Sequence, residues 1–185
     1  VSAHAFDTRA TAAYVLDFST GTVLMAKNAN QPLPPASMSK LMLYYMVFER
    51  IKAGRLAMTD EFTVSEHAWR TGGAGTDGST MFLPLNSKVT VHDLLKGAVI
   101  VSGNDACIVL AEGLFGSEDA YARQATTRGK ELGLTNSTFA NATGLDDPRH
   151  RMSAHDIALL SFRLIKDFPE FYPMFSEPEF TFNKT

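Results

Sequence analysis

Cysteine is almost absent from this 185-residue chain, since Cys107 is the single one, and this excludes an internal disulfide. No run of apolar residues is long enough to cross a membrane, and the first residues lack the apolar core of a complete signal peptide. Histidine is also scarce, and no two of the five have the spacing of a zinc-binding helix. We therefore expect no metal and no cofactor.

A basic run is missing as well, and the formal net charge is −3. This balance excludes the electrostatic signature of a nucleic-acid-binding protein. The 45% of hydrophobic residues suffices for one sizeable core. Without repeats, low-complexity segments or an interdomain linker, residues 1–185 are predicted to form a single domain.

Ser37 and Lys40 form the most informative pattern that is present. Three residues apart on a helix, they share one face, so the lysine amine can reach the serine hydroxyl. The run at 41–48 is apolar all round, which predicts a buried helix and a poorly solvated Lys40. A buried lysine can be the base that a serine nucleophile needs. The alternative from this pattern alone is that Ser37 is only a helix N-cap.

A second polar pattern, Ser102 and Asn104 around Gly103, lies between the apolar stretches 94–101 and 106–111. Such a triplet is well placed to present side chains into a cleft, although both could also be helix caps. Cys107, within the second stretch, is predicted to be a small buried hydrophobe rather than a nucleophile.

Together the two patterns resemble the motifs of the penicillin-recognising serine enzymes, whose set is Ser-x-x-Lys, Ser-x-Asn and Lys-Thr-Gly. The extended form from Ser102 to Ala106 resembles the low-molecular-mass penicillin-binding D-alanyl-D-alanine carboxypeptidases specifically. The resemblance also covers an opening hairpin, a glycine-containing loop near the active site, a further segment, a helix start and a late strand, at 14–24, 78–83, 132–146, 153–158 and 179–183.

The third motif, Lys-Thr-Gly, does not occur in the sequence. Lys184 and Thr185 are interpreted as a coincidence, because they continue the late-strand segment that precedes this box in the family. We expect the box and the C-terminal strands to lie outside this chain, either in the same gene or on a second chain that completes the sheet. Peripheral membrane anchoring would also use residues outside this chain.

The patterning predicts an α+β layout in which a helical lobe is inserted into an antiparallel, β-lactamase/transpeptidase-like sheet. A hairpin is expected over 13–26, a buried helix over 37–53 ended by Gly54, and loops over 63–89. Helices are expected over 91–132, with one start at Val91 and another at Ser117, which has acidic residues in its first turn. A last helix is expected over 153–166, begun by a capping box of Ser153 and Asp156.

The resemblance implies a serine D-Ala-D-Ala carboxypeptidase of the bacterial periplasm, acting on peptidoglycan stem peptides and inhibited covalently by β-lactams. Ser37 would be the nucleophile, Lys40 the general base, and a backbone N–H of Ser37 part of the oxyanion hole. Ser102 would relay a proton to the leaving amine. Asn104 would hold the substrate amide and steady Lys40.

Two other functions share the first two motifs. A serine β-lactamase would need a water-activating glutamate, and none stands in a recognisable loop; Gly103 replaces the usual aspartate too. The glutamates that lack such a neighbouring pattern are Glu112, Glu118, Glu131 and Glu170. A non-catalytic penicillin-binding scaffold is disfavoured by the intact motifs. A Ser-His-Asp site is also disfavoured, because His155 and Asp156 are better explained by a helix start.

Overall fold

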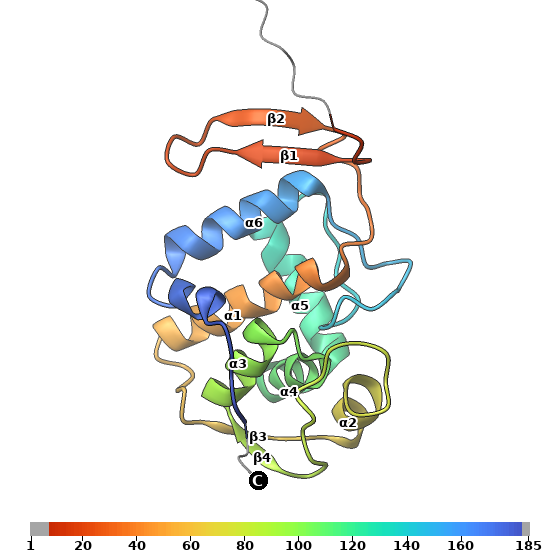
Figure 1. Ribbon diagram of the computed structural model, residues 1–185, viewed down its shortest axis with the longest axis vertical. Coiled ribbons are helices and arrows are strands. Elements are labelled where there is room, and N and C mark those ends of the chain that lie inside the picture. The colour runs from red at the N-terminus through yellow and green to blue at the C-terminus, as the bar shows by residue number, and fades with distance from the viewer. Residues whose placement is uncertain (1–7, 183–185) are drawn as a thin grey trace, which may run out of the picture.

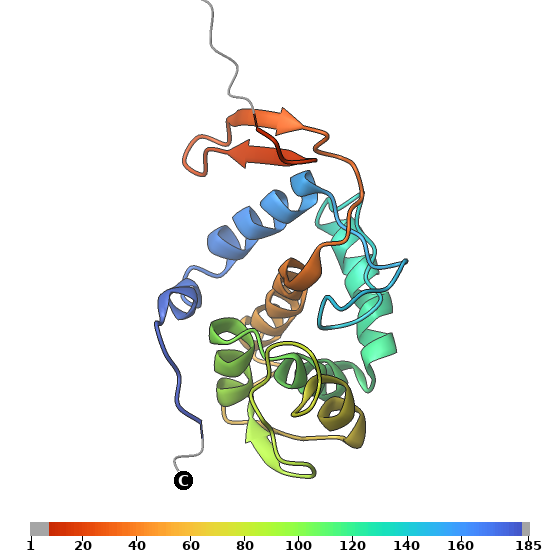
Figure 2. The ribbon, with the colours of Figure 1, turned by 45° about the vertical axis from the view of Figure 1, so that its right-hand side comes forward.

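The computed structural model describes residues 8–182 and arranges them in stacked layers (Figures 1 and 2). The hairpin β1–β2 forms one end, followed by α6, then α1 with α5, then α3, α4 and α2, with the pair β3–β4 at the far end. The helices and strands are β1 (Ala13–Leu16), β2 (Val23–Lys27), α1 (Lys40–Lys52), β3 (Glu61–Thr63), α2 (Glu66–Gly72), β4 (Lys88–Thr90), α3 (Val91–Ile100), α4 (Asn104–Phe115), α5 (Glu118–Glu131) and α6 (Ala154–Asp167). Two 3-10 turns, η1 (Ala36–Ser39) and η2 (Tyr172–Ser176), precede α1 and follow α6.

The predicted hairpin is confirmed, with β1 and β2 antiparallel from the pair Ala13↔Lys27 onward. The Asp17 carboxylate accepts from the backbone N–H of Ser19 at 2.8 Å, and Gly21 takes a φ of +71° that few other residues adopt. One face of the hairpin lies on α6, where the Phe18 and Phe162 ring centroids are 5.2 Å apart.

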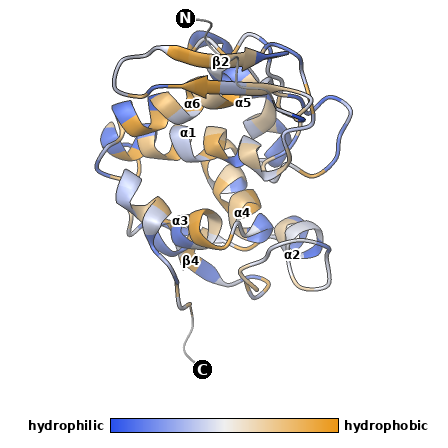
Figure 3. Ribbon diagram, turned by 45° about the horizontal axis from the view of Figure 1, so that its top comes forward, coloured by the Kyte–Doolittle hydropathy of each residue, from blue (hydrophilic) through white to orange (hydrophobic). Residues whose placement is uncertain are grey.

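The predicted buried helix is α1, which runs through the middle of the molecule. Every residue from Met42 to Phe48 is buried, and Gly54, with a φ of +69°, follows its end. Figure 3 shows hydrophobic colour along α4, which packs against α1. The predicted first turn differs in type: residues 36–39 form a 3-10 turn, in which the Met38 N–H donates to the Pro35 carbonyl.

The expected helix starts near Val91, Ser117 and Ser153 are confirmed. Ser117 and Ser153 each accept from the N–H three residues on, at 3.1 Å. The predicted capping box at Ser153 is only half right. The Asp156 carboxylate instead accepts from Asn136 N–H and the Ser137 hydroxyl, at 2.8 and 2.7 Å, so it ties another segment to α6.

The expectation of loops over 63–89 is wrong in part, because α2 lies within this range and the antiparallel strands β3 and β4 overlap its two ends. These strands have three residues each, too short for an alternating pattern to register in the sequence. The late strand is also wrong where it is described: residues 179–182 pair with no strand among residues 8–182. Asn183, Lys184 and Thr185 lie outside the described residues.

The α+β class is confirmed, but the described sheet is two separate two-stranded pieces. Between residues 8 and 182, no helix is long and apolar enough to span a bilayer.

Candidate active site

Two chain segments, residues 37–40 and 102–104, meet at the start of α1. Ser37 lies in η1, Lys40 is the first residue of α1, Ser102 follows the end of α3, and Asn104 is the first residue of α4. Because α4 packs against α1, and α3 against α4, the turn between α3 and α4 faces the start of α1. The structure thus brings together all four residues singled out from the sequence.

The Lys40 amine is the centre of this cluster, and its residue is only 2% exposed. It donates to the Ser102 carbonyl at 2.7 Å, the Ser102 hydroxyl at 2.9 Å and the Asn104 Oδ1 at 2.7 Å. The Ser37 hydroxyl lies 3.5 Å from the amine, at the long limit of a hydrogen bond. A small rotation of Ser37 would place its proton within reach of a neutral Lys40 amine.

Burial lowers the pKa of Lys40, because an ammonium ion loses solvation there. Cys107 and Asp105 on α4 act in the opposite direction. The net shift increases the fraction of neutral amine at a given pH, which is what a general base requires.

Ser102 adopts an unusual backbone conformation, with a φ of +57°. For a non-glycine residue this conformation carries a cost, and here both its carbonyl and its hydroxyl reach Lys40. The N-cap of α4 is Gly103, with no side-chain capping bond. Neither Ser102 nor Asn104 is therefore a helix cap, and the capping alternative is wrong.

A loop that the sequence did not assign to the site packs against Ser37. Gly144, with a φ of +85°, lies so close that a Cβ there would be 2.0 Å from the Ala36 carbonyl oxygen and 3.0 Å from the Ser37 nitrogen. The Asn141 side chain holds this loop by accepting from the Gly144 N–H at 2.8 Å and donating to the Leu145 carbonyl at 2.9 Å. Among the described residues, no acceptor bonds the Ser37 N–H.

Asp105 is a further residue of the site, and the sequence did not predict a role for it on its own. It is fully buried in the first turn of α4, beside Asn104, and its carboxylate accepts bonds from the loop at 80–83. An acid in a helix's first turn is common, so the only signal was its place within the Ser102–Ala106 motif.

The other candidates are accounted for by structural contacts. Ser39 donates to the Ala36 carbonyl at 3.0 Å and steadies η1. His155 lies 3.0 Å from Asp156, whose carboxylate also holds Asn136 and Ser137, so this pair belongs to the α6 start. Cys107 is fully buried, and burial raises its pKa to about 12. No cluster of three metal-ligating acids, histidines or cysteines occurs within residues 8–182.

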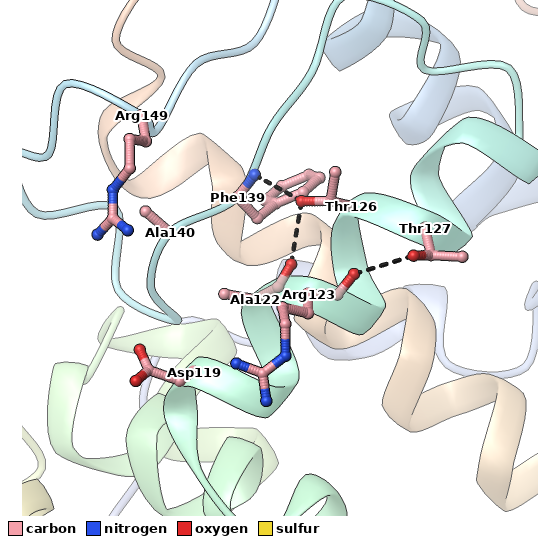
Figure 4. Close-up of a pocket in the computed structure, with 8 residues that line it drawn as sticks. All are labelled: Asp119, Ala122, Arg123, Thr126, Thr127, Phe139, Ala140 and Arg149. Atoms are coloured by element: carbon pink, nitrogen blue, oxygen red, sulfur yellow. Dashed lines mark hydrogen bonds between the residues drawn. The ribbon is translucent and has the colours of Figure 1, made fainter.

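A separate surface hollow lies on α5 (Figure 4). Its threonine hydroxyls are already engaged: Thr126 donates to Ala122 and accepts from Phe139 N–H, and Thr127 donates to Arg123. Arg149 is paired with Asp147 at 2.7 Å. The hollow does not include Ser37 or Lys40.

Comparison with known proteins gives one consistent family. The profile described as D-alanyl-D-alanine carboxypeptidase matches residues 1–185. D-alanyl-D-alanine carboxypeptidase DacC of Escherichia coli (strain K12) is 45% identical over 171 residues, which are 92% of this chain and 43% of that protein. The chain therefore spans less than half the length of this curated relative.

The solved structures agree. Penicillin binding protein 5 from Haemophilus influenzae superposes with a TM-score of 0.92 at 38% identity, over 100% of this chain and 53% of the other. Penicillin-Binding Protein D2 from Listeria monocytogenes, in its ampicillin-bound form, superposes with a TM-score of 0.77 at 28% identity, over 91% of this chain and 66% of the other. The penicillin-binding-protein fold expected from the sequence is thereby confirmed.

Proposed function

The chain belongs to the D-alanyl-D-alanine carboxypeptidase family, and on that premise we propose that it is the N-terminal part of a serine D-Ala-D-Ala carboxypeptidase. Its substrate is the peptidoglycan stem peptide ending in D-Ala-D-Ala, and its place of action is the bacterial cell envelope, on the periplasmic side. The observation that carries the proposal is the buried Lys40 amine, held by Ser102 and Asn104 beside the Ser37 hydroxyl.

In this reaction the neutral Lys40 amine takes the Ser37 proton as Oγ attacks the penultimate carbonyl. The oxyanion is stabilised by backbone N–H groups, among them that of Ser37. Ser102 donates its hydroxyl proton to the leaving nitrogen and takes the proton that Lys40 holds, so that D-alanine departs and an ester on Ser37 remains. Water then attacks the ester, which releases the shortened peptide and restores the Ser37 hydroxyl. Asn104 orients Lys40 and the substrate amide.

The β-lactamase alternative is less well supported. Each of the four glutamates that could activate the deacylating water of a β-lactamase already has a bonding or charged partner. Glu112 accepts from Ser65, Glu118 from the Ala142 N–H, and Glu131 from Arg128. Glu170 lies 3.7 Å from Lys52. The scaffold alternative is disfavoured by the complete Lys40 cluster, since a protein without catalysis has no need of a buried amine.

The Lys-Thr-Gly box and the remaining strands belong, in this proposal, to a segment outside residues 1–185. Support comes from an uncovered apolar hollow between α1, α6 and η2, formed by Leu41, Ser161, Leu164, Ile165, Tyr172 and Phe175. Further strands over this face would bury it and extend the hairpin into a larger sheet.

The test is labelled penicillin with the full-length gene product, followed by assay of D-alanine release from a D-Ala-D-Ala peptide. A carboxypeptidase gives a long-lived adduct of one drug equivalent and releases D-alanine. Rapid turnover of the drug indicates a β-lactamase, and no adduct indicates a scaffold. The Ser37→Ala variant should show no adduct. An adduct that persists in this variant would overturn the assignment.

A further inference from the structure

Asp105 is a fully buried carboxylate beside the catalytic cluster, and no described basic side chain is paired with it. Its Oδ1 accepts from the N–H groups of Met81 at 2.8 Å and Ala106 at 2.9 Å. Its Oδ2 accepts from the Leu83 N–H at 3.0 Å and the Thr80 hydroxyl at 2.9 Å. Burial of a carboxylate is costly unless such donors replace water, and these four donors take the place of the water that Asp105 loses.

These bonds fasten the loop at 79–83 to the start of α4. The Asn104 N–H donates to the Ser79 carbonyl at 2.8 Å, next to the Asp105 contacts. Met81 fills the space over Gly97 of α3, where a Cβ would lie 2.2 Å from its sulfur. With Met81 and Leu83 both bonded to one carboxylate, Phe82 between them takes a φ of +59° and stays 69% exposed. The loop thus has little freedom to move away from α4.

We propose that Asp105 is a positioning residue of the active site, holding Asn104 and the loop at 79–83 so that the Lys40 amine stays directed at Ser37. The inference rests on the proposed function for its catalytic consequence. Asn104 is clamped on both sides, since its N–H bonds Ser79 and its neighbour Asp105 bonds the rest of the same loop. Its Oδ1 lies 2.7 Å from the Lys40 amine, so a shift of the clamp moves an acceptor of that amine.

Asp105 acts on Lys40 through its negative charge as well as through the contacts that position Asn104. Two charged or titratable groups face this amine, Cys107 and Asp105, both on α4. They raise the pKa of Lys40 and so oppose the lowering caused by burial. The groups in direct contact with the amine are neutral oxygens from η1, from the turn before α4 and from Asn104 at the start of α4. Removing the negative charge should lower the pKa of Lys40 further. Neutral amine would then persist to lower pH.

Two variants separate these effects. Asp105→Asn keeps the size of the side chain, loses the charge, and leaves the Leu83 N–H facing an amide NH₂ in place of an oxygen. Thr80→Val removes the hydroxyl bonds within the loop, to Asp105 and from the Phe82 N–H, and keeps the Asp105 charge. Asp119→Asn is the matched control, because Asp119 is an exposed acid in the first turn of α5.

The experiment measures acylation of the full-length gene product by a fluorescent penicillin as a function of pH. A displacement of about 1 Å in the reacting groups costs about 10²-fold in rate, and we expect a loss of this order for Asp105→Asn. The acid limb of its profile should move to lower pH. Thr80→Val should be acylated more slowly than wild type, with the acid limb of its pH profile unchanged. Asp119→Asn should match wild type in both rate and profile.

A second readout does not depend on activity. The Nζ and Cε resonances of Lys40, assigned by their absence from Lys40→Arg, report its titration directly. They should titrate at lower pH in Asp105→Asn than in wild type and in Asp119→Asn. If wild type is not acylated, the proposed function fails while this titration still tests the role of Asp105. The inference would be overturned if Asp105→Asn were acylated at the wild-type rate and its Lys40 titrated at the wild-type pH.

Discussion

Replacing Lys40 by arginine should abolish most of the acylation of Ser37. Arginine keeps the positive charge and much of the length but does not deprotonate in proteins, so it cannot take the serine proton. A positioned general base contributes about 10²–10⁴ in rate, which corresponds to about 3–5 kcal/mol of transition-state stabilisation. The loss should lie at the upper end, because Lys40 is 2% exposed and little water can replace it as the base.

The larger guanidinium also has little room, since the amine already lies 2.7 Å from both the Ser102 carbonyl and the Asn104 Oδ1. Lys40→Met therefore serves as a second variant, similar in length and without charge or donors. The assay is the rate of penicillin adduct formation by stopped-flow fluorescence, with melting temperatures to check folding. Lys96→Arg, on α3 and paired with Glu177 at 2.7 Å, is the matched control.

The reasoning fails if Lys40→Arg is acylated within a few fold of the wild-type rate. Lysine would then only hold charge near Ser37, and another group would have to accept the proton. If Lys40→Arg and Lys40→Met both unfold, the rate loss would reflect structure instead of base catalysis. Lys96→Arg should change neither rate nor melting temperature.

Three further predictions concern groups around the site. Gly144→Ala should slow acylation strongly and lower the melting temperature, because its Cβ would lie 2.0 Å from the Ala36 carbonyl; Gly54→Ala, also at positive φ but with open space, should cost only about 1 kcal/mol in unfolding free energy. His150 is 1% exposed, and burial lowers its pKa below the ordinary 6.5. The unfolded chain therefore binds the proton first, so denaturant-measured stability should fall as pH drops through and below 6.5, and His150→Gln should flatten this dependence. Cys107 should resist a thiol reagent in the native protein and react on unfolding, because it is fully buried and its pKa is raised to about 12.

Each of these can fail clearly. Gly144→Ala with normal acylation would mean that the loop does not seat Ser37. A stability that stays level in acid would mean that His150 titrates alike in the folded and unfolded states. Rapid labelling of native Cys107 would mean that α4 opens to solvent.

Local features were determined by the sequence alone. Ser117 and Ser153 predicted their helix starts because an N-cap hydroxyl needs only the N–H three residues ahead. Ser37 and Lys40 could be placed on one side of a helical turn for the same reason: three residues of helix fix their geometry. The apolar run after Lys40 predicted its burial.

The meeting of Lys40 with Ser102 and Asn104 is different, because 62 residues separate Lys40 from Ser102. No local rule predicts that contact, and only the family resemblance suggested it. The packing of α4 against α1, and of α3 against α4, brings it about. Likewise, β3 and β4 are strands because they pair with each other, not because three residues have a strand preference.

Only the tertiary structure decided what several polar side chains do. Asp156 looked like half of a capping box, yet its carboxylate holds Asn136 and Ser137. Asp105 looked like an ordinary first-turn acid, yet it is fully buried and bonds the loop at 80–83. A carboxylate has several acceptor sites, and which donors reach them depends on segments distant in the chain. Composition and spacing can therefore identify a group able to do chemistry, while its partners, and so its role, come from packing.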